Sequence, residues 1–388
     1  MTNTRQSFGI QTLLLAVICI DTLLTPISLI LGHLGFSAGF HFFKFPFVTI
    51  YVLLIFRAVK YGLVNNATIR FLVAIFFLAC IVGLSRGQLN SAFLSHLYHI
   101  SLAISACSLG CLMDLDRLKV AISKYHSSIV LFALVFAVIY FICYRIGLIS
   151  YWGVSSNFGL IAVMIATSGR SKLLVTLVFA IVLTGKRTVL LGTISVILVY
   201  YLLRDLKLMT IVKVGIVFAV FGYLGFSFGL LSRFIQPFAI EDSTRFWYVI
   251  TSGRNFEVVY ALQEFETWVD WLVGFGYGMR FELPMGMDNL SDSYQLHYTH
   301  FSPMSIMLLY GAVTTLILYI LFFKFAWLAL KNMRSNYSVF CVLYLYAFLT
   351  SFAGATLFVD PKFWLLLGIM IRVGQLEMPK IQKRHGYA

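Results

Sequence analysis

Two histidines, His297 and His300, stand three residues apart, just ahead of a long apolar stretch that begins near residue 302. Imidazole titrates near neutral pH, so a histidine in this place is suited to act as a general base or to bind an acceptor group. A metal site is a second interpretation, with Asp288 and Asp292 as further ligands. A plain interfacial histidine is the third. We favour the base, because no DxD or HExxH pattern accompanies the pair.

Several cations lie at or near the ends of predicted membrane-spanning segments, where no topology rule requires them. Lys186 and Arg187 open an apolar stretch in the middle of the chain. An ionisable group at membrane depth is expensive and therefore points to function, although both side chains could instead snorkel to lipid headgroups. Further candidates to bind a phosphate group are Arg86, Arg245, Arg254 and Arg280.

The composition defines the elements that must position these residues. The 388 residues are 60% hydrophobic and 11% charged, with a mean hydropathy of +0.91, whereas soluble domains are about 25% charged. Because about 20 apolar residues cross a bilayer as a helix, we expect an all-α polytopic membrane protein with roughly 12 transmembrane helices. The expected spans are 8–31, 40–56, 69–85, 90–112, 127–147, 153–168, 172–185, 187–203, 210–231, 302–323, 337–355 and 357–373.

The distribution of positive charge predicts an orientation. Roughly two thirds of the 29 lysines and arginines fall in alternate connecting segments, which the positive-inside rule assigns to the cytoplasm together with both termini. This rule also explains the net charge of +14 without nucleic acid as a partner. Residues 232–300 are then one large loop on the outer side, within a single integral membrane domain, 1–388. The six cysteines all lie in apolar stretches and indicate no disulfide framework.

Segment 241–270 of this loop has helical periodicity, with a break at Ser252 and Gly253. Its expected polar face includes Glu257, and we expect the helix to lie on the membrane surface or on the spans. The expected apolar stripe consists of Phe256, Val259, Tyr260, Leu262, Phe265 and Trp268. Farther on, Gly274, Gly276 and Gly278 alternate with aromatic residues. They lack the strand and βαβ unit of a nucleotide-binding motif, so we expect a turn whose backbone packs closely under a ligand or a span.

These features together resemble one family. They are Gly185 to Thr188 opening a mid-chain helix, one large late loop, the glycine-rich patch Trp271 to Gly278, and His300 followed by Gly311 in the next span. The chain is similar to the Wzy-like O-antigen polymerases and O-antigen ligases, which are membrane glycosyltransferases of the GT-C type. The likeness covers about residues 180–330.

The resemblance implies a metal-independent transferase without cofactors, located in the bacterial inner membrane. It would move a glycan from undecaprenyl pyrophosphate to a sugar hydroxyl at the periplasmic face. It assigns Arg187 and Arg254, or else Arg245, to the pyrophosphate and His300 to the base. Phe301 stands where ligases often have a polar residue, which favours the polymerase, with a possible chain-length regulator as partner. A ligase that acts on lipid A core and a lipid-linked oligosaccharide flippase are the alternatives.

Overall fold

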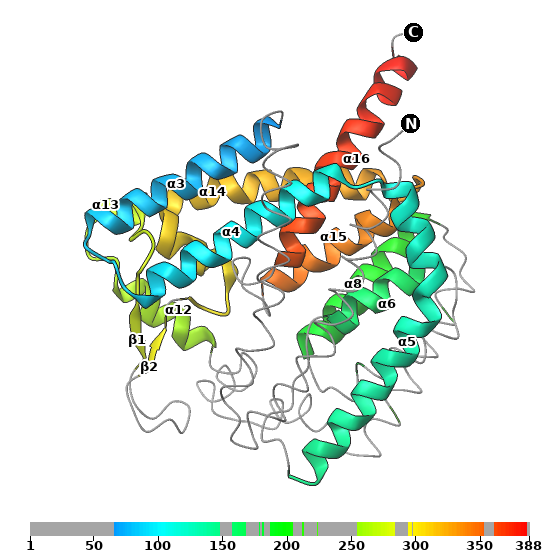
Figure 1. Cartoon of the computed structure of the whole chain (residues 1–388), viewed down its shortest axis with the longest axis horizontal. Helices are drawn as coiled ribbons and strands as arrows, with labels where there is room; N and C mark the ends of the chain where they lie inside the picture. Colours follow the sequence, from blue (N-terminus) through cyan, green and yellow to red (C-terminus); the bar gives the residue numbers. More distant parts are fainter. Residues whose placement is uncertain are drawn as a thin grey trace, which may run out of the picture.

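The computed structural model describes residues 66–147, 157–167, 187–204, 254–283, 294–296, 298–352 and 361–385, and four single positions, 178, 181, 212 and 223. These residues form helices and one two-stranded ribbon (Figure 1). The longer helices are α3 (Ala67–Ser85), α4 (Ser91–Leu112), α5 (Leu115–Arg145), α6 (Asn157–Thr167), α8 (Arg187–Arg204), α14 (Ser302–Lys331), α15 (Ser338–Ser351) and α16 (Pro361–His385).

Each of these helices overlaps a stretch that the sequence predicts to be helical, although α14 and α16 continue to Lys331 and His385, past the predicted ends at 323 and 373. The agreement is closest at α3, α4, α8 and the start of α14. Helix α5 begins at Leu115, before the predicted start at 127. Its first turns are polar and carry Asp116 and Arg117, so hydropathy does not detect them. The predicted spans 8–31, 40–56, 172–185 and 210–231 lie wholly or almost wholly outside the described residues.

Among the described residues, three helices are long and apolar enough to cross a membrane, and they are α3, α4 and α14. Their lateral surfaces expose large apolar side chains, such as Phe77 on α3 and Leu316 on α14. In water such surfaces would be covered, since exposed apolar patches of this extent mark contact with lipid or with another protein. The helices therefore suggest a membrane protein.

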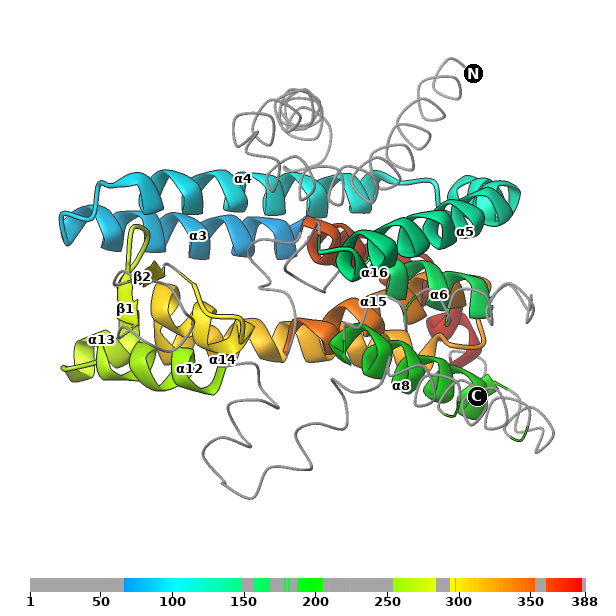
Figure 2. The ribbon, with the colours of Figure 1, turned by 90° about the horizontal axis from the view of Figure 1, so that it is seen from below.

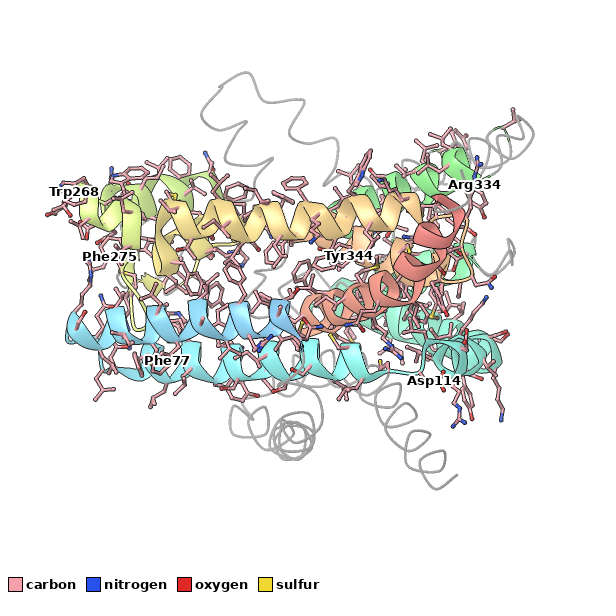
Figure 3. All side chains as sticks on the ribbon, turned by 90° about the horizontal axis from the view of Figure 1, so that it is seen from above. Phe77, Asp114, Trp268, Phe275, Arg334 and Tyr344 are labelled. Atoms are coloured by element: carbon pink, nitrogen blue, oxygen red, sulfur yellow. The ribbon has the colours of Figure 1, made fainter. Side chains whose placement is uncertain are left out.

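Helices α3, α4 and α14 run in roughly the same direction, which gives this part of the bundle two ends (Figure 3). At the "turn end", defined by Asp114 and Arg334, Lys119 donates a hydrogen bond to the carbonyl of Asn336 and Arg334 donates to the carbonyl of Leu203. The connections after α4 and α14 and the last turn of α8 thus meet there. At the "loop end", marked by Trp268 and Phe275, the α3–α4 turn and the ends of these helices contact residues 270–280.

The loop end is held together by residues 274–278, here called the glycine strap. The strap passes between α3 and the first turns of α14 (Figure 2). The backbone N–H groups of Phe275 and Gly276 donate to the carbonyls of Leu308 and Leu309, and that of Tyr277 donates to the carbonyl of Ala79. Buried non-helical backbone needs such partners, because no water reaches it.

Helix α14 bends to receive the strap. Gly311 has φ 74° and ψ 170°, which interrupts the helix and frees carbonyl groups in the turn before it. The Tyr277 and Tyr310 hydroxyls form a buried hydrogen bond of 3.2 Å beside this bend. The strap therefore donates hydrogen bonds to the carbonyl groups that the kink in α14 leaves without helical partners.

Glycine is required on both sides of this contact. A Cβ on Gly276 would overlap the backbone of Gly83 in α3, and a Cβ on Gly83 would overlap the carbonyl of Tyr277. Gly276 also has φ 76°, a conformation that L side chains rarely adopt. The close packing expected for the glycine-rich turn is confirmed, and the partner is a helix.

Candidate active site

The site begins with α12 (Arg254–Gln263), which follows the predicted break at Ser252 and Gly253. The hairpin-like ribbon of β1 (Phe281–Leu283) and β2 (Tyr294–Leu296) places Phe281 opposite Leu296. Because α12 packs against β1 and α14, the chain that leaves β2 returns beside α12 just before α14 begins. This return brings His300 to α12.

Glu257 of α12 holds His300 at two points. The backbone N–H of His300 donates to Glu257 Oε2 over 2.7 Å, and His300 Nδ1 lies 2.8 Å from Oε1 and 3.1 Å from Oε2. An ionised carboxylate only accepts hydrogen bonds, so Nδ1 must carry the proton. In the neutral ring Nε2 is then the unprotonated nitrogen, which can accept a proton from a substrate.

The exposure of the two side chains fits this division of roles. The Glu257 side chain is 12% exposed, whereas the His300 side chain is 44% exposed. A buried carboxylate that orients a half-exposed imidazole is the arrangement by which hydrolases and transferases prepare a general base. We refer to Glu257 and His300 as the dyad.

The turn that carries His300 is stiffened by hydroxyl groups. Ser305 Oγ accepts a hydrogen bond from the backbone N–H of Thr299 and donates one to the Thr299 carbonyl. The Thr299 hydroxyl donates to the carbonyl of Phe301. Serine is a common helix cap, but Ser302 does not cap α14. Phe301 is the N-cap and makes no side-chain cap bond, while Ser302 is already helical.

The face of α12 also differs from the prediction. Glu257 and Ala261, one turn apart, are buried, whereas Val259 and Leu262 of the expected apolar stripe are exposed. Beyond α12, Phe265 of the stripe is buried as expected and Trp268 is exposed. Glu257 therefore does not lie on a polar outer face. Sequence reasoning missed its function because the residue that explains its burial, His300, lies 43 positions away.

Two of the predicted arginines each begin a helix, Arg254 beside the dyad on α12 and Arg187 on α8. Arg254 is the first residue of α12 and stands three positions before Glu257, so the two residues share a helical face. Arg187 is the first residue of α8. Leu203 of α8 meets Arg334 at the turn end, and Gly192 lies against Thr350 near the close of α15. Helix α8 therefore points its Arg187 end toward the loop end.

The other two described arginines have structural partners at the loop end. Arg86 forms an ion pair with Asp270, with 2.8 Å between Nη2 and Oδ1, and its guanidinium lies 5.0 Å from the centroid of the Phe275 ring. Arg280 donates a hydrogen bond to the hydroxyl of Ser91. These contacts give both residues a role in packing, and their predicted role in pyrophosphate binding stays a prediction.

The remaining predicted site residues, Lys186, Arg245 and His297, lie outside the described residues. Within the described part of the chain, no group of three or more His, Cys, Asp or Glu side chains is arranged to hold a metal ion. A scan against protein-family models, a search of curated proteins and a search of solved structures each find no match for the chain.

Proposed function

We propose that the protein is a glycosyltransferase of the bacterial inner membrane, and within that class a polymerase of a surface polysaccharide. It would transfer a glycan from undecaprenyl pyrophosphate to a hydroxyl of another lipid-linked repeat unit at the periplasmic face. The observation that carries the proposal is the dyad. A buried carboxylate fixes the ring of His300 and leaves Nε2 of a half-exposed base at the loop end.

The dyad can activate a sugar hydroxyl as a nucleophile. A hydroxyl is a poor nucleophile, so Nε2 of His300 takes its proton while the oxygen attacks the anomeric carbon of the donor. The bond between that carbon and the pyrophosphate oxygen breaks, and undecaprenyl pyrophosphate leaves with its electron pair. The Glu257 carboxylate stabilises the imidazolium that results.

The arginines act on the leaving group. A guanidinium binds phosphate oxygens in a bidentate manner and stays charged at every physiological pH. Arg254 shares the face of α12 that carries Glu257, and Arg187 is the first residue of α8. We assign both to the charge that develops on the leaving pyrophosphate.

The test is a gel of surface polysaccharide from a deletion strain that carries the wild-type gene or the His300→Ala variant. We expect a ladder with wild type and a single repeat unit on the lipid core with the variant. Polymer that accumulates on the carrier lipid in the deletion strain would indicate a ligase instead. Repeat units trapped on the cytoplasmic side would indicate a flippase.

A further inference from the structure

The helix at the far loop end, α13 (Trp268–Val273), has an unusual surface. Apart from Asp270, each of its residues is a large apolar side chain that is more than a third exposed, and Trp268 reaches 73%. These exposed residues are Trp268, Val269, Trp271, Leu272 and Val273. A surface helix in water buries its apolar side, so the environment of α13 is not bulk water.

The orientation of α13 is fixed by the bundle. Thr267 and Asp270 form a reciprocal capping box at its start, and Asp270 is paired with Arg86 at the end of α3. At its other end, the backbone of Leu272 lies so close to Gly311 that a Cβ there would overlap it. The apolar side chains are thus presented outward by contacts to the two spans.

A second exposed tryptophan lies toward the turn end. Trp327 of α14 is 60% exposed, and the Lys331 ammonium lies 5.4 Å from its ring centroid. From Gly311, which touches α13, to Trp327 the helix rises about 24 Å at 1.5 Å per residue. The hydrocarbon core of a bilayer is about 30 Å thick. From Gly311 to Phe323 the exposed side chains of α14 are apolar, and the first exposed charge, Lys324, lies within one turn of Trp327. These apolar residues are Val313, Leu316, Ile317, Ile320 and Phe323.

We propose that α13 is an interfacial anchor that lies in the boundary between headgroups and acyl chains of the bilayer at the loop end. Tryptophan suits this boundary, because its ring is apolar and its indole N–H can donate to a headgroup. Trp327 marks the opposite boundary. Since α13 is tied to α12 through only a few residues, with the rings of Phe265 and Trp271 4.8 Å apart, the anchor sets the depth of the dyad in the membrane. The inference does not depend on the proposed reaction.

The test uses tryptophan fluorescence of the full chain in proteoliposomes. The vesicles contain phosphatidylcholine brominated either near the headgroup or near the chain end. The difference between wild type and Trp268→Phe isolates the emission of Trp268 among the six tryptophans. The same subtraction with Trp364→Phe gives a control, since Trp364 is buried. Trp327→Phe reports on the other boundary.

We expect the shallow bromines to reduce the Trp268 emission about twofold, more than the deep bromines do, and to leave Trp364 nearly unchanged. Quenching of Trp268 by aqueous iodide but not by either lipid would overturn the proposal, because α13 would then face water. Protection from both lipid and iodide would also overturn it, since a protein surface, from this chain or from a second copy, would then cover α13.

Discussion

Glu257 accepts hydrogen bonds from both the backbone and the ring of His300, although 43 residues separate them in the chain. The backbone bond fixes the position of the residue and the ring bond fixes its tautomer. A carboxylate with these two tasks acts by positioning the base, so its loss has a signature different from loss of the base itself.

We predict that Glu257→Gln lowers the rate of polymerisation by at least about tenfold, while His300→Ala lowers it by about 10²-fold or more, as for a general base. The amide can donate to Nδ1 as well as accept from it, so the ring loses its single tautomer. The measurement is the initial rate with a lipid-linked repeat unit in proteoliposomes, with kcat and KM determined separately. A purely structural role would instead reduce the amount of folded protein and leave kcat of that fraction unchanged.

Glu282→Gln is the matched control, because Glu282 is an exposed carboxylate on the neighbouring strand β1. Its rate should equal that of wild type. Equal rates for Glu257→Gln and wild type would remove Glu257 from the site and leave His300 without a partner that selects its tautomer.

The arginine assignment predicts a graded response. Arg254→Ala and Arg187→Ala should each abolish the polysaccharide ladder, while the corresponding lysine variants should retain part of it. Lysine keeps the charge but not the bidentate geometry. Arg117→Ala is the control, because Arg117 forms an exposed pair with Asp114 at the turn end, where such pairs contribute little. A wild-type ladder from both alanine variants would contradict the assignment.

The strap predicts a ranking of glycine variants. A Cβ added at Gly87 meets no atom within 4 Å, but the residue has φ 69°. Gly87→Ala should therefore lower the free energy of unfolding only by the conformational strain of about 1–2 kcal/mol. Gly276→Ala adds overlap with α3 backbone, which costs about 1–3 kcal/mol more. Thermal unfolding in detergent, followed by size-exclusion fluorescence, should place Gly276→Ala clearly below Gly87→Ala. Similar unfolding temperatures would mean that the strap is not packed against α3.

The contact between α13 and α3 predicts a pH dependence. Burial raises the pKa of the Asp270 carboxyl, but hydrogen bonds from Thr267 and Arg86 and the charge of Arg86 outweigh it, so the pKa lies below its ordinary value. A lowered pKa stabilises the fold above the unfolded value of about 3.9, and this stability is lost as the pH falls through the folded value. Thermal unfolding between about pH 5 and pH 3 should therefore be less steeply pH-dependent in Asp270→Asn than in wild type. The same pH dependence in both proteins would mean that the Arg86–Asp270 pair does not stabilise the fold.

Much of the helical layout follows from hydropathy. The predicted stretches 69–85 and 90–112 coincide with α3 and α4 within two residues, because the apolar residues stop at Arg86 and Asn90. The C-terminal end of α14 differs more from the prediction. It continues to Lys331, eight residues past the predicted end at 323, since a helix extends beyond its membrane-compatible part when polar residues such as Lys324 still favour helix.

The site was predictable only in part. His300 stood out because a titratable group precedes an apolar stretch, and Arg254 because it lies in the polar loop. Glu257 did not stand out, since local periodicity assigns a carboxylate to the outer face and carries no information about a partner 43 residues away. The burial of α12 is decided by β1, β2 and the turn before α14, which are tertiary contacts. A hydropathy pattern carries no information about these contacts.

The glycine strap has a consequence for biosynthesis. Asn90, in the turn between α3 and α4, donates a hydrogen bond to the carbonyl of Gly278, which is 188 residues later in the chain. Helices α3 and α4 therefore leave the ribosome well before the segment that completes their packing. Because the strap also binds Leu308 and Leu309 of α14, the seam beside Gly83 can close only after translation has passed both segments. The packing of the loop end against α3 and α4 is therefore completed late, after these two helices have been made.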